Sequence, residues 1–352
     1  MELPNSLNSM IIFPNSLKTL KKASERKKRQ TSLKVLKSFW SHSIIMRIID
    51  NFLFHSEYDL LELRLEIMYD HVDHFVIVES DHTFTEIPKE YNLEKNISRY
   101  EKWKDKIVYI KANQHKTEAP TITREKAFEN ESWARNQFKL GWEQIGLKDE
   151  DILIVSDCDE IIRPETLKFM RENSYDYYAL MSPIFNFKFN YMNTGSEYVV
   201  WPTAYKYYSN LEYTPSSMRR IDIEYRDSRF KNRFKEVTQK SEPITSILLH
   251  HAAWHFSSLG NEEAIRNKLT SYSHVEYNRP DYLDNINIDN MIRENKNHIN
   301  QNSGCWKKVK LDDYFPKVVL NNIEKYKKYI LEGDDCETVI HHYGRNILDK
   351  EV

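Results

Sequence analysis

The segment "ILIVSDCDEI", residues 152–161, places three carboxylates within four positions, directly after a run of bulky apolar residues. Unpaired buried charge is costly and neighbouring like charges raise one another's pKa, so these acids either reach water or meet a positive partner. Alternate residues of an extended segment share a side, so we expect Asp157 and Asp159 to point together while Cys158 faces the core. Two hard oxygen ligands suit Mg²⁺ or Mn²⁺, which commonly bridge substrate phosphates. The segment therefore predicts a divalent-cation site, the alternative being that Asp159 or Glu160 caps the next helix.

A second group of polar side chains belongs to "AWHFS", residues 253–257. His255 could supply a nitrogen ligand to the same ion, or be a hydrogen-bonded structural histidine beside Trp254. A phosphate-bearing ligand would also need cations and hydrogen-bond donors around it. The candidates, each of which could instead be an ordinary polar residue of a helix surface, are Arg135, Asn136, Arg266 and Lys268.

Apolar runs that alternate with helical periodicity precede and contain the acidic segment. The predicted strands are residues 47–54, 74–80, 106–112 and 151–157, and the predicted helices are residues 57–72 and 124–146, the latter ending at Gly146. Continuous apolar strands between helices are typical of a parallel sheet covered on both faces. We therefore expect a doubly wound α/β domain, in which ligands bind beyond the carboxyl ends of the strands.

The pattern changes after residue 175, where aromatic, Pro-broken segments favour antiparallel hairpins. The predicted elements here are strands in residues 177–192, 197–208 and 244–257, and a helix over residues 261–274 with Asn261 as its N-cap. We expect one enzyme-sized domain over residues 46–305. A helical extension over residues 306–352 is expected to pack on it. Residues 1–45 form a basic arm that we expect to be poorly ordered, and residues 21–37 could make a weak contact with anionic lipid or a partner.

Composition excludes several classes of protein. A net charge of −2 gives no basic footprint for nucleic-acid binding. Three cysteines without a Cys-x-x-Cys pair indicate neither a disulfide framework nor a zinc site, and favour a reducing compartment. No apolar run approaches the roughly 18 to 20 residues of a membrane span. Gly-x-Gly-x-x-Gly, Walker-type and Gly-x-Ser-x-Gly motifs are absent. We therefore expect a cytoplasmic enzyme that is neither a Rossmann dehydrogenase, a P-loop NTPase nor a serine hydrolase.

Four blocks in order resemble glycosyltransferase family 17: "FHSEYDLLELRLEIMYDHVDHFVIVES", "WARNQ", "ILIVSDCDEI" and "AWHFSSLGNEEAIRNKLTSYSHVEYN". The resemblance extends from about Met46 to Asn278 and is more specific than the Asp-x-Asp alone. It implies a GT-A-like fold and an inverting transfer from a nucleotide sugar, UDP-N-acetylglucosamine, to a glycan hydroxyl. The sequence departs from the family pattern at "DEIIRP", where "DEIP" is common.

The resemblance also assigns roles by position. Asp157 and Asp159 look like the pair that holds the metal and the diphosphate, with Asp159 the more direct ligand. His255 falls where a third ligand is often found in GT-A enzymes. Glu57 and Glu79, at the ends of the first two predicted strands, fall near the nucleotide.

The implied reaction is an in-line displacement at the anomeric carbon, in which Mn²⁺ or Mg²⁺ neutralises the departing diphosphate. An acidic residue takes the proton from the acceptor hydroxyl, and Glu263 is preferred over Asp222 for this role. Aromatic side chains that could stack on an acceptor sugar, or simply fill the core, are Tyr191, Trp201 and Tyr205.

Two other classes of function compete with the transferase. In an Asp-x-Asp phosphohydrolase the first aspartate after a strand is the nucleophile, but that strand usually lies near the start of the domain. A non-catalytic sugar-binding protein could retain the same fold, although the intact acid pair and His255 argue against it.

Overall fold

The computed structural model describes residues 46–113, 122–195, 199–219, 234–241, 243–298, 305–333 and 336–339. All of them belong to one compact unit that begins at Met46. Asp222 and the basic segment 21–37 lie outside the described residues. In the part of the chain that is described, no helix is long and apolar enough to cross a membrane.

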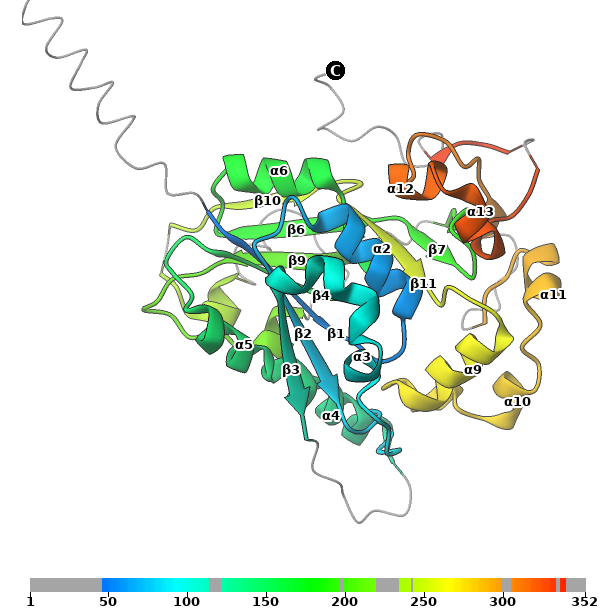
Figure 1. Ribbon diagram of the computed structural model, residues 1–352, viewed down its shortest axis with the longest axis horizontal. Helices are drawn as coiled ribbons and strands as arrows, with labels where there is room; N and C mark the ends of the chain where they lie inside the picture. Colours follow the sequence, from blue (N-terminus) through cyan, green and yellow to red (C-terminus); the bar gives the residue numbers. More distant parts are fainter. Residues whose placement is uncertain are drawn as a thin grey trace, which may run out of the picture. The chain divides into compact units, whose positions relative to one another are not determined.

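A seven-stranded sheet forms the centre of this unit (Figure 1). Its strand order is β10-β6-β9-β4-β1-β2-β3, and every neighbouring pair is parallel except the two that involve β9. The strands are β1 (Ile48–Leu53), β2 (His74–Ser80), β3 (Ile107–Ala112), β4 (Ile152–Asp157), β6 (Tyr177–Ser182), β9 (Val199–Lys206) and β10 (Ser246–Leu249). The predicted mainly parallel α/β sheet is thus confirmed.

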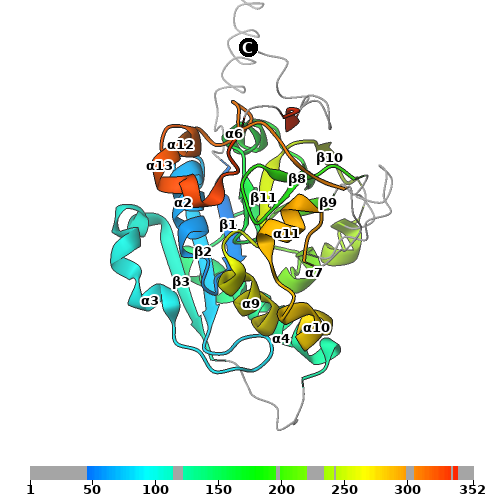
Figure 2. The same cartoon turned by 90° about the vertical axis from the view of Figure 1, so that its right-hand side faces the viewer.

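Helices cover both faces of this sheet because its strands are apolar on both sides. Ile48 and Phe52 of β1 share a core with α2 (Tyr58–Met68), the 3-10 helix η1 (Ile97–Lys106) and α6 (Pro164–Glu172). Ile49, on the other side of β1, shares a core with α5 (Phe138–Ile145) and α7 (Pro215–Arg219). Figure 2 shows α2 and α7 on opposite sides of the sheet. Continuous apolar strands therefore produced the layered arrangement that the sequence predicts.

A second sheet has the order β12-β8-β7-β11-β5, and all its neighbours are antiparallel except β7 and β11. Its strands are β5 (Glu160–Ile162), β7 (Ile184–Asn186), β8 (Tyr191–Asn193), β11 (Ala253–Ser257) and β12 (Trp306–Lys308). The expected antiparallel section therefore exists, but two predicted strands are divided between the sheets. Residues 244–257 form β10 and β11, because the chain turns at His251, whose φ is +53°. Residues 177–192 leave the main sheet at Pro183, which has no N–H for the ladder.

The predicted helix over residues 124–146 is also two helices, α4 (Arg124–Asn136) and α5, which meet at Gln137. Gly146 ends α5 at a φ of +62°, the left-handed conformation that favours glycine. Asn261 caps α9 (Glu262–Ser271) through its side chain, which accepts from the amide of Ala264. Both predicted caps are confirmed.

Short helices complete the unit. They are α3 (Asn92–Lys95), η2 (Val275–Tyr277), α10 (Pro280–Leu283), α11 (Ile288–Arg293), α12 (Lys317–Leu320), α13 (Ile323–Tyr326) and η3 (Lys327–Tyr329). Phe315, Val319 and Tyr326 are buried in the same core as the apolar residues of α2. This C-terminal segment therefore packs directly on the α2 side of the main sheet.

Candidate active site

A cavity of about 1000 Å³ opens at the carboxyl edge of the main sheet. It is lined by the segments that follow β1, β2 and β4, by one side of α4, and by the segment from β11 into α9. Ligand pockets in proteins commonly range from about 300 to 1000 Å³, so a ligand of nucleotide-sugar size fits here. Its position is the one expected for the binding crevice of an open α/β sheet.

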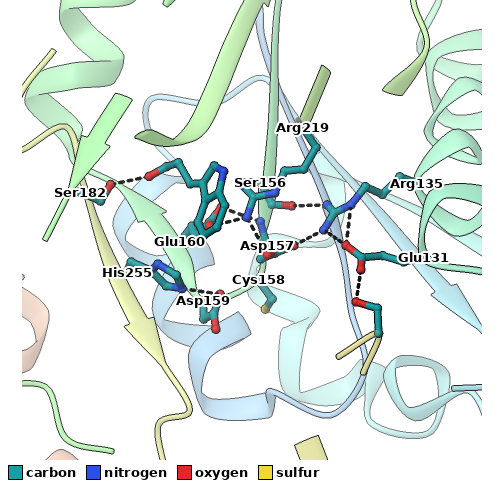
Figure 3. A network of polar contacts seen from close by, with 12 residues as sticks. Glu131, Arg135, Ser156, Asp157, Cys158, Asp159, Glu160, Ser182, Arg219 and His255 are labelled. Atoms are coloured by element: carbon teal, nitrogen blue, oxygen red, sulfur yellow. Dashed lines mark hydrogen bonds and ion pairs between the residues drawn. The ribbon is translucent and has the colours of Figure 1, made fainter. Parts of the chain in front are cut away.

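The acidic segment forms the turn that joins β4 to β5. Asp157 ends β4, Cys158 and Asp159 form the turn, and Glu160 begins β5. Cys158 is buried, as predicted, and burial raises the pKa of its thiol. Asp157 and Asp159 both line the cavity but contact different partners, because the backbone here turns instead of continuing as an extended strand (Figure 3). The two aspartates therefore have different protein partners, and their joint binding of one cation stays a prediction.

Asp157 is held by two arginines. Its Oδ1 accepts from Arg135 Nη2 at 2.5 Å and its Oδ2 from Arg219 Nη2 at 2.7 Å. Burial alone would raise the pKa of Asp157, but the charges and hydrogen bonds of the two arginines lower it well below the usual range. Arg135 is itself buried and also binds Glu131 at 2.7 Å, and Glu131 accepts from the Ser273 hydroxyl. Both oxygens of Asp157 are thus engaged in a network of alternating charge.

Arg219 extends this network toward the second sheet. It donates to Glu160 Oε1 at 2.5 Å, and its guanidinium carbon lies 4.9 Å from the centre of the Trp201 ring. Glu160 Oε2 in turn accepts from the Asp157 amide at 2.9 Å, so this carboxylate stabilises the turn. Burial raises the pKa of Glu160 in spite of Arg219. Arg219 Nη1 is buried without a hydrogen-bond partner among the described residues.

Asp159 contacts a lysine and a histidine. Its Oδ2 accepts from Lys268 Nζ at 3.1 Å, and its Oδ1 lies 3.7 Å from His255 Nε2. Burial would lower the pKa of Lys268, but the neighbouring Asp159 raises it above its usual value. In the described part of the chain, neither Asp159 Oδ1 nor His255 Nδ1 has a hydrogen-bond partner, although both atoms are buried. Buried polar atoms without partners are rare in proteins, so a ligand is expected beside them.

Within the described residues, no group of three His, Cys, Asp or Glu side chains converges closely enough to hold a metal ion. Two donors, Asp159 Oδ1 and His255 Nε2, face one another at a separation that a shared cation could bridge. An oxygen and an imidazole nitrogen suit Mn²⁺ or Mg²⁺ only if the substrate and water supply the remaining ligands. The residues therefore fit a cation held by Asp159 and His255, whereas both oxygens of Asp157 already accept hydrogen bonds from arginines.

The other predicted residues lie in several places. Glu263 and Glu57 both line the cavity, and Glu57 Oε2 accepts from the amides of His55 and Ser56. Asn136 lies outside the cavity lining, where its Oδ1 accepts from the amide of Ser216 at 3.1 Å and joins α4 to α7. The prediction that Asn136 binds phosphate is not supported by this placement.

Glu79 and Arg266 are also placed away from the expected ligand. Glu79 is fully buried, and its two oxygens accept from Lys89, Tyr109 and two amides at the start of α3. Arg266 lies on the exposed side of α9, where it donates to the Leu283 carbonyl. The hydrogen bonds of Glu79 therefore hold the segment that enters α3, and the hydrogen bond of Arg266 joins α9 to α10.

The three aromatic candidates also separate. Tyr191 and Tyr205 are fully buried in the core, whereas Trp201 lines the cavity beside Arg219. Trp201 is the one of the three that a ligand can contact.

Comparison with known proteins completes this description. No curated protein sequence matches the chain. Among solved structures, the inositol-1-phosphate CTP transferase from T. maritima matches with 11% sequence identity and a TM-score of 0.33, covering 63% of this chain and 94% of that one. The family model for glycosyltransferase family 17 matches residues 13–234, more than half of the chain. The match includes Asp157, Asp159 and both arginines of the network, and it ends before His255 and Lys268. The chain therefore belongs to glycosyltransferase family 17, and it is a glycosyltransferase.

Proposed function

We propose that this glycosyltransferase moves N-acetylglucosamine from UDP-N-acetylglucosamine to a hydroxyl of a glycan, with inversion at the anomeric carbon and with a divalent cation. The observation that carries the proposal is the buried Asp159 Oδ1, which has no hydrogen-bond partner in the described part of the chain and lies 3.7 Å from His255 Nε2. Asp159 lines a cavity of nucleotide-sugar size, and the neighbouring imidazole of His255 gives it a second donor, so the two side chains together fit a ligand site. The family supports the reaction class, and the donor sugar follows from the family resemblance.

Asp159 and His255 would hold the cation, and Mn²⁺ or Mg²⁺ bound there would supply Lewis-acid neutralisation of the departing diphosphate. Lys268, which hydrogen-bonds to Asp159 and lines the same cavity, adds a fixed positive charge for the phosphates. The charge of Asp157 is balanced by Arg135 and Arg219, which also belong to the lining of the cavity. These cations are preorganised and need little rearrangement as charge develops on the leaving group.

The acceptor hydroxyl must lose a proton as the new bond forms. Glu263, in the first turn of α9 and in the lining of the cavity, is the proposed base. Asp222 remains the alternative base and lies outside the described residues. Trp201 offers a flat apolar surface at the same cavity, which suits stacking on a sugar ring of the acceptor.

The contacts of Asp157 weigh against the phosphohydrolase alternative. A nucleophilic aspartate needs a carboxylate oxygen that can attack phosphorus, but here each oxygen accepts from a different arginine. The sugar-binding alternative predicts binding of donor or glycan without turnover.

One assay separates these functions: incubation of the full chain with Mn²⁺ and a panel of UDP-sugars, followed by measurement of released UDP. We expect release from UDP-N-acetylglucosamine that is abolished by EDTA, restored by Mn²⁺, and lost in Asp159→Ala. Absence of nucleotide-sugar binding with and without metal would refute the proposal. Phosphate release from simple phosphomonoesters would instead favour the hydrolase, and donor binding without UDP release would favour the binding protein.

A further inference from the structure

A fully buried arginine lies directly beneath the acidic turn. Arg64 projects from α2, has no exposed surface, and stacks on Phe52 of β1 with its guanidinium carbon 4.3 Å from the ring centre. It forms a two-pronged ion pair with Asp50, which is equally buried, through bonds of 2.8 Å and 2.6 Å. Arg64 does not line the cavity, so it is placed to act from behind the site.

The remaining donors of Arg64 reach the turn itself. Nη1 donates to the main-chain carbonyls of Asp157 at 2.9 Å and Glu160 at 2.6 Å, and Cys158 O lies 3.4 Å away. Nη2 also donates to the Ser156 hydroxyl at 2.6 Å. The planar guanidinium thus holds the main chain on both sides of Asp159 from one rigid group.

Stability alone is a weak explanation for this arrangement. A buried ion pair loses much of its attraction to desolvation, and well-packed apolar residues often replace such a pair without loss of stability. The main-chain carbonyls of Asp157 and Glu160, by contrast, both accept from Arg64, and a buried carbonyl needs such a donor. Arg64 is the donor they find, and Asp50 neutralises its charge.

We infer that Arg64 is a positioning residue, which fixes the β4–β5 turn so that Asp159 faces Lys268 and His255 while Asp157 faces its two arginines. This inference rests on the proposed function, since the aligned side chains are those assigned to cation and diphosphate binding. Arg64 acts through the backbone of the turn and not through contact with substrate.

The fold contains a matched control. Arg171 of α6 also donates to two main-chain carbonyls, those of Met46 and His71, and to one aspartate, Asp73. These contacts lie where β1 and β2 begin, at the opposite edge of the sheet from the cavity. Arg171 therefore forms the same kinds of hydrogen bond as Arg64, in a partly exposed ion pair and without access to the acidic turn.

The test compares Arg64→Met/Asp50→Val with Arg171→Met/Asp73→Val, both in the full chain. Each double variant removes a whole ion pair, which avoids an unpaired buried charge. For the Arg64 pair we expect a folded protein whose kcat for UDP release is lowered by about 100-fold and whose Mn²⁺ requirement is raised by about tenfold, the scale of losing an outer-shell support. For the control pair we expect both quantities to stay within about threefold of the original protein per folded molecule.

A second variant keeps the inference testable if the first does not fold. Asp50→Asn retains Arg64 and its bonds to the turn, so we expect a lower Tm but a kcat within about threefold of the original, whereas Arg64→Lys, which cannot reach several carbonyls at once, should lose kcat. Wild-type kinetics in Arg64→Lys or in the folded double variant would overturn the inference.

Amide hydrogen exchange gives a result that does not depend on activity. We expect faster exchange in the peptide covering residues 156–162 for the Arg64 variants and unchanged exchange there for the Arg171 variants. Unaltered protection of that peptide would refute the positioning role. Altered protection in a protein whose wild-type form releases no UDP would instead refute the proposed function and leave the structural role of Arg64 standing.

Discussion

The two edges of the main sheet both bring arginines and aspartates together, but they do so differently. At the amino edge, Arg47 binds Asp151 at 2.5 Å and Arg171 binds Asp73 at 2.8 Å. Each aspartate also accepts from a main-chain amide, and no buried side-chain atom of these four residues lacks a hydrogen-bond partner. These pairs close the ends of strands and leave nothing for a ligand to satisfy.

At the carboxyl edge the same residue types surround a cavity and remain partly unsatisfied. Asp157 is shared by two arginines, and the buried atoms Asp159 Oδ1, His255 Nδ1 and Arg219 Nη1 have no hydrogen-bond partner among the described residues. The difference indicates that charge pairing by itself does not mark a functional site. What marks it is an excess of donors and acceptors at a cavity, because unsatisfied buried groups are costly unless a ligand completes them.

The largest expected contrast is between Asp159 and Asp151. We predict that Asp159→Ala lowers kcat/KM for UDP release by on the order of 10³-fold or more, because it removes both the proposed cation ligand and the partner of Lys268. Its Tm should fall less than that of Asp151→Ala, since the lysine that loses its partner is one-third exposed and Asp159 Oδ1 makes no hydrogen bond within the described residues.

Asp151→Ala provides the opposite outcome. It leaves Arg47 without its partner and should lower the free energy of unfolding by about 3 kcal/mol, while kcat/KM per folded molecule stays near the original value. Thermal unfolding and steady-state kinetics on both variants measure the contrast. A large loss of activity in Asp151→Ala at temperatures where it is folded would contradict the division between the two edges.

The next contrast lies within the acidic turn. Asp157→Asn keeps the shape of the side chain but removes the charge that orients Arg135 and Arg219, so we predict that kcat/KM falls by about 10- to 100-fold. The concentration of Mn²⁺ that gives half-maximal activity should change little, because both oxygens of Asp157 are held by arginines. A titration with Mn²⁺ that shifted as strongly in Asp157→Asn as in Asp159→Asn would show that both aspartates are ligands.

Local sequence patterns were sufficient to predict the carboxyl edge of the main sheet, but not the network of ion pairs around Asp157. The apolar strands, the acidic turn and the caps at Gly146 and Asn261 depend on neighbouring residues, and the structure contains them. Arg219 lies about sixty residues after Asp157, in a short helix without a recognisable pattern. No local property of the sequence indicates that its side chain returns to the turn.

Arg64 is a different kind of omission, because a signal for it was present. Leu60, Leu61 and Met68, one turn before and one turn after Arg64, are all buried on the core side of α2. An arginine in the middle of an apolar helical stripe needs a buried partner. Glu79 shows the converse limit, since a strand-end carboxylate resembles a ligand in the sequence, and only the structure reveals that loop amides and Lys89 saturate it.

A smaller effect should distinguish Lys268 from Lys206. We predict that Lys268→Met raises the KM for the UDP-sugar by about tenfold or more, because the proposed charge-assisted contact to phosphate is lost. Lys206→Met, whose lysine binds Glu150 at 3.0 Å at the amino edge, should lower Tm and leave KM unchanged. Donor KM measured for both variants tests this.

The pH dependence provides a further check on Lys268. Asp159 raises the pKa of this lysine above its usual value, so the side chain stays positively charged until the pH rises through that elevated pKa. The contribution of Lys268 to donor binding should therefore be constant between about pH 7 and pH 9. If the KM of Lys268→Met divided by the KM of the original protein decreased as the pH rose from about 7 to about 9, the positive charge assigned to Lys268 would be contradicted.

The smallest expected effect concerns Cys158, the residue between the two aspartates. Its side chain is buried in the hydrophobic core that β1 shares with α2. Cys158→Ala should therefore lower the free energy of unfolding by about 1 kcal/mol and change kcat/KM by less than about threefold. Burial raises the pKa of its thiol, so a thiol reagent should modify the partly exposed Cys305 and Cys336 first and leave Cys158 unmodified in the folded protein. Cys158 also belongs to the cavity lining, so its rapid modification with loss of activity would mean that its thiol turns from the core into the cavity. In that event Arg64 could not hold the turn from the core side, and the carboxyl edge would lose the arrangement that separates it from the amino edge.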